Sequence, residues 1–192
     1  MSGEFPHVIS PNEYRRQGEK LGIARDVLDS ATARMATNRR LGSRAILSLG
    51  HLSHLTGAPY PYLRELIERR RDPYSEHSRR KRGSGVRPIS IPEPVLMDVQ
   101  RFILDSALSN ISFSASSFAY QKGKSVVDCA SRHLGARWLV KLDLHNFFSS
   151  VREQDVYSAF QARGYSRLVS FELARLCTRA SLQSNLAPDR YP

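Results

Sequence analysis

Five cations, with no acid among them, stand within nine positions of the chain: Arg79, Arg80, Lys81, Arg82 and Arg87. Gly83 and Gly85 lie inside the same run, and a glycine lets the backbone approach a phosphate group closely. The planar guanidinium of arginine also binds phosphate oxygens in pairs. The run therefore predicts a site for a triphosphate or for a nucleic-acid backbone. A block of solvated charge is the alternative interpretation.

A carboxylate, Asp143, stands in a stretch of alternating residues from Trp138 to Phe148. This alternation has the period of a half-buried strand, with Val140, Leu142 and Leu144 on one face and Asp143 on the more polar face. An Asp at a strand end more often forms a turn or a cap, because its side chain bonds nearby backbone amides. The pattern alone does not decide whether Asp143 is a turn or cap residue or a functional carboxylate.

Two glycine motifs fail on spacing. Gly123-Lys124-Ser125 is similar to the end of a P-loop, but Phe118 occupies the place of the required first glycine. Gly83-Ser84-Gly85 lacks the third glycine of a dinucleotide-binding fingerprint, because Pro88 stands there. Neither motif predicts a nucleotide-binding fold.

The cysteines and histidines do not form a pattern of metal ligands. Cys129 and His133 stand four apart on one predicted helix, without a further Cys/His pair, so core packing is expected and zinc is not indicated. His51 and His54 are expected at the surface or in contact with RNA or DNA.

The composition narrows the class of protein. The 192 residues include 29 Lys and Arg against 18 Asp and Glu, a net charge of 29 − 18 = +11, and such an excess favours polyanionic partners. Two cysteines cannot form a disulfide framework. There is no N-terminal leader pattern and no apolar run of membrane-spanning length. We expect a cytoplasmic protein with reduced thiols and no membrane association.

The elements that must position these residues follow from the apolar spacing. Helices are predicted at 44–55, 61–67, 94–107, 126–134, 153–163 and 166–178, and strands at 86–91 and 138–148. Ser125 and Asp128 form a capping-box pattern at the start of one helix, and the helix beginning at Pro94 has an apolar stripe of Val95, Val99, Phe102, Ile103 and Ala107. Residues 74–85 are expected to form a basic loop, and 181–192 to be unstructured.

Three segments together carry a resemblance to a known family: Arg87 to Pro92 (RPISIP), Phe118 to Ser125 (FAYQKGKS) and Leu142 to Val151 (LDLHNFFSSV). In this order and at these separations they resemble the opening blocks of a bacterial reverse transcriptase, the retron type most of all. The resemblance runs from about Leu49 to Thr178.

The resemblance implies roles for individual residues. Arg87 matches the arginine that clamps the incoming triphosphate, with Lys81 or Arg82 as a second phosphate contact, and Arg79, Arg80, Lys122 and Lys124 are expected to contact nucleic acid. Asp143 matches the first catalytic carboxylate, and the carbonyl of Leu144 a further metal contact. Phe148 matches the bulky residue that excludes a ribose 2′-hydroxyl. The implied cofactor is Mg²⁺, as two ions, and the implied substrates are a dNTP, an RNA template and a DNA or RNA primer.

The chain also departs from the family pattern. The Leu-Pro-Gln-Gly block and the Tyr-x-Asp-Asp hairpin that follow in the family do not occur before Pro192. We therefore expect a chain that is inactive alone. It is a truncated gene product, an engineered fragment or one half of a split enzyme, and in the last case a second chain supplies the rest of the palm. We also expect marginal stability, because the face of Val140, Leu142 and Leu144 stays uncovered. A dedicated noncoding RNA and a role in antiviral defence are further implications of the resemblance.

The resemblance implies an α+β fold, with right-hand polymerase fingers and an incomplete antiparallel palm sheet. The expected parts are an N-terminal extension (1–43), a fingers-like region with a helical hairpin and the basic loop (44–136), and the first part of the palm (137–192). One alternative is a non-catalytic nucleic-acid-binding protein that uses residues 49–67 as a helix-turn-helix. A weaker one is an interaction module that recruits a partner through an unpaired strand.

Overall fold

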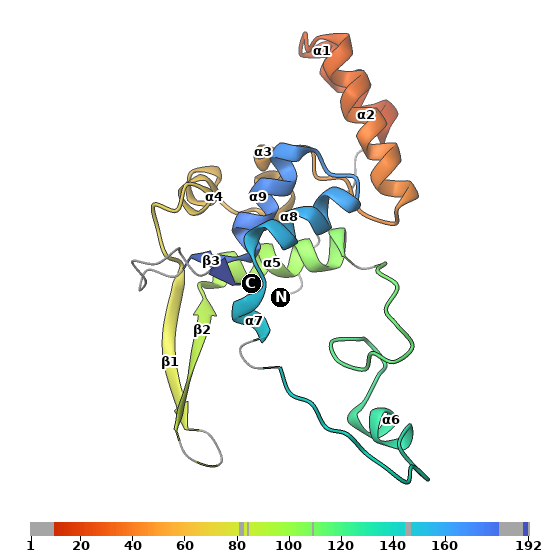
Figure 1. The fold of residues 1–192 in the computed structure, drawn as a ribbon. Helices are drawn as coiled ribbons and strands as arrows, with labels where there is room; N and C mark the ends of the chain where they lie inside the picture. Colours follow the sequence, from red (N-terminus) through yellow and green to blue (C-terminus); the bar gives the residue numbers. More distant parts are fainter. Residues whose placement is uncertain are drawn as a thin grey trace. The chain divides into compact units, whose positions relative to one another are not determined.

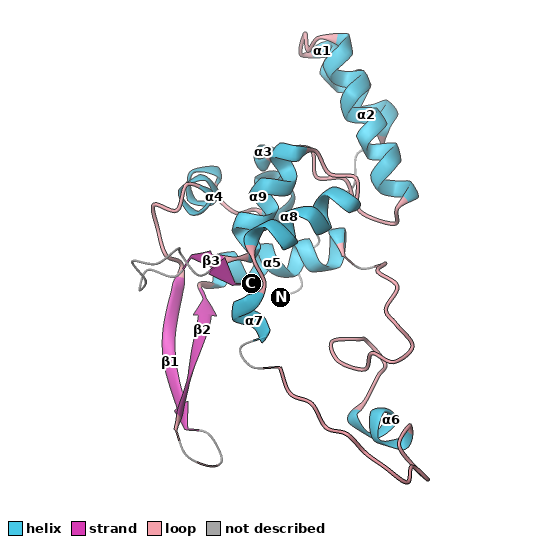
Figure 2. Cartoon of the chain, in the orientation of Figure 1, coloured by secondary structure: helices cyan, strands magenta, loops and turns pink. Residues whose placement is uncertain are grey.

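The structure is a computed structural model of the 192-residue chain, and it describes residues 10–80, 83, 85–108, 110–144, 147–180 and 190–191. It mixes helices with small antiparallel sheets (Figures 1 and 2). Two compact units are present. Unit 1 comprises residues 1–110 and 148–192, and unit 2 comprises residues 111–147.

Unit 1 begins with a helical arm, α1 (Pro11–Lys20) and α2 (Arg25–Arg40). The Ser10 side chain accepts a hydrogen bond from the Glu13 amide and so caps α1. Gly18 is buried against Leu28 of α2, and a Cβ at Gly18 would overlap the Leu28 side chain. The absence of a side chain at Gly18 therefore lets the two helices pack closely.

The core of unit 1 lies among five helices: α3 (Leu49–Thr56), α4 (Tyr60–Ile67), α5 (Pro94–Ala107), α8 (Glu153–Ala162) and α9 (Arg167–Cys177). These five helices confirm the helices predicted in the same regions. α3 and α9 begin later than the predicted helices at 44–55 and 166–178. Gly57 ends α3 at φ 71°, a left-handed conformation that costs glycine little. The predicted stripe of α5 is buried except at Val95, which is 40% exposed, and Leu96 is buried in its place.

The C-terminal end of α2 docks onto the turn between α8 and α9. The buried Asn38 amide donates to the Arg163 carbonyl at 2.8 Å, and Gly164 lies against Thr37 and Leu41. The Tyr165 hydroxyl donates to the Arg44 carbonyl at 2.6 Å. These contacts fix the arm to the helical core.

A β-hairpin occupies the segment that we expected to be a basic loop. Strand β1 (Tyr74–Arg80) pairs antiparallel with β2 (Val86–Pro92), so the predicted strand at 86–91 is confirmed and the loop prediction for 74–80 is wrong. The hairpin extends away from the helices of unit 1 (Figure 1). Residues 75–80 are exposed, so neither face of β1 has to be apolar there. The sequence of β1 therefore lacks the alternation of apolar and polar residues that would predict a strand.

A second pairing joins β3 (Arg179–Ala180) to β4 (Arg190–Tyr191). The expectation of an unstructured end is therefore wrong at 190–191, and positions 181–189 and 192 lie outside the described residues.

Unit 2 contains α6 (Val126–Ser131), while α7 (Phe147–Ser150) spans the boundary between the two units. The Ser125–Asp128 capping box is confirmed, and α6 is shorter than predicted. The predicted strand at 138–148 is wrong. Residues 138–144 lie in an irregular segment, because no other strand of the described chain pairs with them. Val140, Leu142 and Leu144 are 80%, 88% and 71% exposed, so these side chains are uncovered, but they do not form the face of a strand.

None of the described helices combines the length and the apolar character needed to cross a membrane.

Candidate functional site

The hairpin brings arginines from both of its strands together near the turn. Arg79 stands directly opposite Arg87 in the register, and Arg80 stands opposite Val86. The side chains of Arg79 and Arg80 are exposed, and Lys81 and Arg82 lie outside the described residues. Like charges directly opposite each other in a sheet are destabilising unless an anion compensates them. This end of the hairpin, which we call the hairpin tip (79–87), therefore suits a polyanion.

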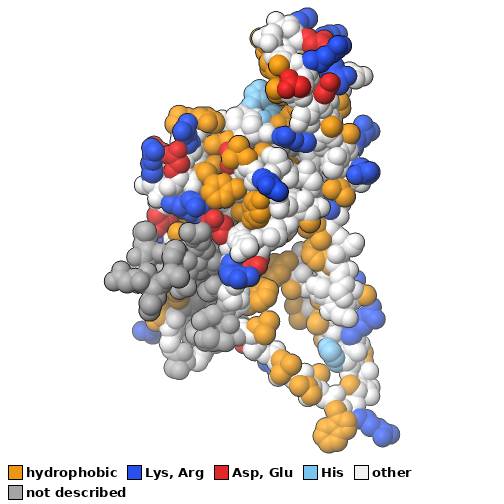
Figure 3. All heavy atoms as spheres, turned by 45° about the horizontal axis from the view of Figure 1, so that its top comes forward, with side chains coloured by type: hydrophobic (Ala, Val, Ile, Leu, Met, Phe, Trp, Pro, Cys, Tyr) orange, Lys and Arg blue, Asp and Glu red, His pale blue; other side chains and the backbone are white. Residues whose placement is uncertain are grey.

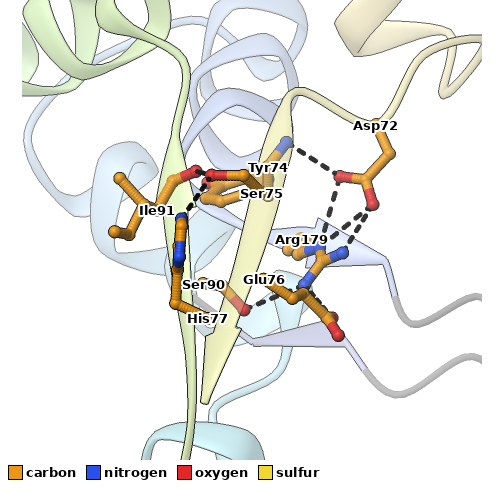
Figure 4. Close-up of polar contacts among 8 residues, drawn as sticks. All are labelled: Asp72, Tyr74, Ser75, Glu76, His77, Ser90, Ile91 and Arg179. Atoms are coloured by element: carbon orange, nitrogen blue, oxygen red, sulfur yellow. Dashed lines mark hydrogen bonds and ion pairs between the residues drawn. The ribbon is translucent and has the colours of Figure 1, made fainter. Parts of the chain in front are cut away.

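The base of the hairpin is held by Arg179 (Figure 4). Its guanidinium bonds Asp72 at 2.6 Å, Glu76 of β1 at 2.6 Å and the Ser90 hydroxyl of β2 at 2.9 Å. It also lies over the Tyr74 ring, 5.3 Å from the centroid. The hydrogen bond to Asp72, supported by the one to Glu76, raises the pKa of Arg179 although partial burial opposes the shift. Arg179 is therefore a structural cation.

A second ionic group joins the end of α4 to α8 and α9. The buried carboxylate of Glu153 binds Arg69 at 2.9 Å and Arg175 at 3.2 Å. Arg69 also donates to the Thr178 carbonyl at 2.6 Å, and it holds an unusual left-handed φ of 59°. A buried ion pair of this kind is costly to break on one side, because the other charge is then left uncompensated.

A third group fixes the entry to α5. Arg71 binds Glu93 at 2.7 Å, and the Tyr62 hydroxyl donates to Glu93 at 3.1 Å. Partial burial and the bond to the carboxylate raise the pKa of Tyr62 to about 12. The hydrogen bond from Arg71 in turn lowers the pKa of Glu93. Together these contacts fasten the loop before β1 to the segment after β2.

Asp143 and Leu144 lie in unit 2, where both residues are exposed. Lys122 is exposed in the same unit, and the Lys124 ammonium lies 5.6 Å from the centre of the Phe118 ring. Phe148, in α7, is 53% exposed and belongs to unit 1. The structure thus brings Arg79, Arg80 and the backbone of Arg87 together in unit 1 and leaves Asp143 in unit 2.

The donors around Asp143 fit a divalent metal ion in kind but not in number. A carboxylate and a backbone carbonyl are the hard oxygen ligands that Mg²⁺ prefers. Over the described part of the chain, however, no group of three or more His, Cys, Asp or Glu side chains could hold a metal ion. The described residues alone therefore do not complete a metal centre.

The core packing that we expected for Cys129 and His133 is wrong, because α6 buries no residue and His133 is exposed. Cys129 and Cys177 are free thiols, and burial raises the pKa of Cys177 to about 12, which disfavours its thiolate form. The ring of His51 accepts a hydrogen bond from the Leu47 amide at 3.2 Å. His54 is exposed.

The sequence did not reveal the structural roles of Arg179, Arg69 and Glu153. Most of their bonding partners lie 84 to 109 positions away along the chain, so no local pattern marks them. Nor does overall charge locate the site. Lys and Arg side chains are scattered over the face shown in Figure 3 rather than gathered in one patch. The signal within the sequence was local, in the five cations near the hairpin turn.

Comparison with known proteins gives the family. The family model described as reverse transcriptase (RNA-dependent DNA polymerase) matches residues 79–185, more than half of the chain. The chain is 30% identical over 152 residues to the retron Ec86 reverse transcriptase of Escherichia coli, which covers 78% of this chain and 48% of that protein. It is 35% identical over 103 residues to the retron Mx65 reverse transcriptase of Myxococcus xanthus, which covers 54% of this chain and 24% of that protein.

The match to the retron Mx162 reverse transcriptase of the same organism is 31% over 100 residues and covers 21% of that protein. The chain therefore spans less than half the length of these relatives. The matched region contains the basic hairpin tip, Asp143 and Phe148. The chain belongs to the reverse transcriptase (RNA-dependent DNA polymerase) family and is of the retron type.

Proposed function

We propose that the chain is part of an RNA-directed DNA polymerase, which transfers a nucleotide from a dNTP to a primer 3′-hydroxyl on an RNA template. The observation that carries the proposal is the hairpin register, which places Arg79 opposite Arg87 at an exposed tip. The family match over residues 79–185 supports it independently. In this proposal the chain contributes polymerase fingers and the first part of a palm, divided at 1–43, 44–136 and 137–192.

The hairpin tip binds phosphate groups. Arg87, with Lys81 and Arg82, contacts the triphosphate, because a guanidinium can bind two phosphate oxygens at once. Arg79 and Arg80 contact the nucleic-acid backbone, and so do Lys122 and Lys124. The glycine at position 85, at φ 98°, supports this role because its backbone is open to a phosphate.

Two Mg²⁺ ions complete the site in this proposal. Asp143 and the Leu144 carbonyl supply oxygen ligands, and a second polypeptide supplies the further carboxylates that two ions need. The chain alone is then inactive.

Phe148 selects the sugar. Its ring is half exposed at the start of α7, as a residue that contacts a substrate must be. A bulky side chain there excludes a 2′-hydroxyl by steric overlap. The proposal therefore includes deoxynucleotide selectivity.

The remaining partners follow from the same proposal. They are a primer, an RNA template and a dedicated noncoding RNA. The proposed location of the chain is the cytoplasm, and its proposed role is antiviral defence. The family membership of the chain supports these partners only as a class.

Primer extension tests the proposal. We expect no extension of a DNA primer on an RNA template by the chain alone. Extension should appear when a polypeptide carrying the family's Leu-Pro-Gln-Gly and Tyr-x-Asp-Asp blocks is added. Asp143→Asn should abolish it, whereas the matched change Asp98→Asn, at an exposed aspartate on α5, should not. Phe148→Ala should admit ribonucleotides.

Two results contradict the proposal in different ways. Extension by the chain alone that is lost in Asp143→Asn contradicts the need for a second polypeptide. Nucleic-acid binding without extension in the completed mixture favours the second candidate, a non-catalytic binding protein. In that candidate Arg64 is the exposed cation of α4. It is already paired with Glu68 at 2.9 Å, which favours an ordinary helical hairpin over a DNA-binding helix-turn-helix.

A further inference from the structure

The hairpin is bonded to the helices of unit 1 at its base. The Tyr74 hydroxyl accepts a hydrogen bond from Gln100 of α5 at 2.9 Å, while Glu76 and Ser90 bond Arg179. All three hairpin residues lie in the half of the hairpin away from the tip. The direction in which the tip points therefore depends on what holds this base.

Arg179 is placed to hold both strands at once. Glu76 and Ser90 are register partners across β1 and β2, and one guanidinium nitrogen bonds the side chains of both. Its other nitrogens bond Asp72, in the loop before β1, at 2.6 and 3.2 Å. The Arg179 side chain is only 11% exposed. It stands two residues after the end of α9, so it links the hairpin to a helix of the core.

The arginines near Arg179 are each already paired with a glutamate. A hollow of about 170 Å³ beside Arg179 is lined by Arg69, Arg70 and Arg71. Arg69 is bound to Glu153, Arg70 to Glu68 at 2.8 Å and Arg71 to Glu93. Arg69 and Arg71 thus join separate segments of the chain, and Arg70 pairs with a near neighbour. Arg79 and Arg80, in contrast, have no carboxylate partner among the described residues.

We propose that Arg179 is a positioning residue, which fixes the direction of the hairpin and thereby places the phosphate-binding tip. The consequence for phosphate binding rests on the proposed function, whereas the fastening of the hairpin rests on the contacts of Arg179. Arg80 stands four positions after Glu76, a distance of about 14 Å at roughly 3.4 Å per residue. A rotation of about 10° at the base therefore moves the tip by about 2 Å, which is enough to misplace a bound phosphate.

The side-chain chemistry of arginine is needed for this role. Its planar fork reaches Asp72 and the Glu76–Ser90 pair in different directions at the same time. A lysine has a single ammonium group and cannot span these partners. Arg179→Lys should therefore retain the charge and part of the binding to Asp72, but fasten the hairpin less well than arginine.

Spin-label distances test the fastening directly. Labels are placed at Ser78→Cys on β1 and Arg167→Cys on α9, both exposed, in a chain carrying Cys129→Ser and Cys177→Ala. We expect a narrow distance distribution with Arg179, a broad one with Arg179→Met and an intermediate one with Arg179→Lys. Arg163→Met is the matched control, because Arg163 donates to Ser43 and Ala107 away from the hairpin.

Glu76→Gln keeps the test meaningful if Arg179→Met does not fold. It removes one ionic partner from an exposed position and should broaden the distribution to a smaller extent. A distribution as narrow in these variants as in the parent chain overturns the proposal.

Affinity for inorganic tripolyphosphate, measured by calorimetry, tests the consequence. Arg179→Met should weaken binding about three- to tenfold through lost pre-organisation, while Arg163→Met should leave it unchanged. A broadened distribution with unchanged affinity overturns the positioning role. If the parent chain does not bind tripolyphosphate, the proposed function fails, and the distance distributions still decide whether Arg179 fastens the hairpin.

Discussion

Arg79 lies in the hairpin and Arg179 contacts its base, but their surroundings give these two arginines opposite roles. Arg179 is largely buried among two carboxylates, whereas Arg79 is exposed and faces another arginine across the strands. A cation bound to two carboxylates has little charge left for a ligand, while two facing arginines gain from an anion. Burial and pairing, which the sequence does not display, therefore separate the structural cations from those available to bind phosphate.

His51 supplies a prediction about pH at the scale of one side chain. Burial, together with nearby His54 and Arg44, lowers the pKa of His51 below its usual 6.5. The unfolded chain then binds a proton more readily than the folded chain as the pH falls below 6.5, so the free energy of unfolding should fall with the pH in that range.

Urea unfolding between about pH 7.5 and 5 measures this effect. His51→Asn should make the unfolding midpoint less dependent on pH, and His133→Asn, at an exposed histidine, should not. An unchanged pH dependence in His51→Asn would contradict the burial of this ring.

The roles of Asp143, Arg87 and Phe148 stay predictions, made from their place in the three family-like blocks. The comparison adds that all three lie within the region matched by the family model. Glu153 and Arg69 were not identified, because a buried ion pair between positions 84 apart leaves no local pattern.

At the scale of elements, apolar periodicity predicted the helices well and the strands poorly. α5 and α9 bury one continuous face, which the sequence displays at helical spacing. β1 is exposed from Ser75 to Arg80, so its strand conformation there depends on its backbone bonds to β2 rather than on apolar burial. Residues 138–144 show the opposite case, since their alternation fits a strand but they have no partner strand in the described chain. A strand depends on its neighbour, which the local sequence does not contain.

The docking of α2 supplies a prediction at this scale. Gly164 has φ 84°, and a Cβ there would lie 2.9 Å from the Thr37 methyl and 3.1 Å from Leu41. Gly57 has a similar φ of 71° with no atom within 4 Å. Gly57→Ala should cost about 1–2 kcal/mol for the left-handed backbone. Gly164→Ala should cost about 1–3 kcal/mol more, because it also overpacks the contact.

Urea unfolding of the two variants checks the difference. Both glycines lie in unit 1, so the comparison isolates the contact with α2. Equal losses in the two variants would show that α2 is not packed against the turn before α9.

At the scale of the whole molecule, a net charge of +11 predicts affinity for polyanions without saying where they bind. Cations are spread over the face shown in Figure 3, and several are engaged by carboxylates at the hairpin base and among the helices. We therefore expect specific binding to depend on the few arginines at the hairpin tip, and a general electrostatic attraction to depend on the total charge.

Binding of a labelled RNA–DNA primer–template, followed by fluorescence anisotropy at several salt concentrations, tests this claim most directly. The variant Arg79→Gln/Arg80→Gln is compared with Arg34→Gln/Arg167→Gln, which removes two exposed arginines from α2 and α9. The account predicts that the hairpin variant binds about tenfold more weakly and loses about two units of salt slope, while the control changes little. Equal weakening in both variants would contradict it, because binding would then follow total charge rather than the hairpin.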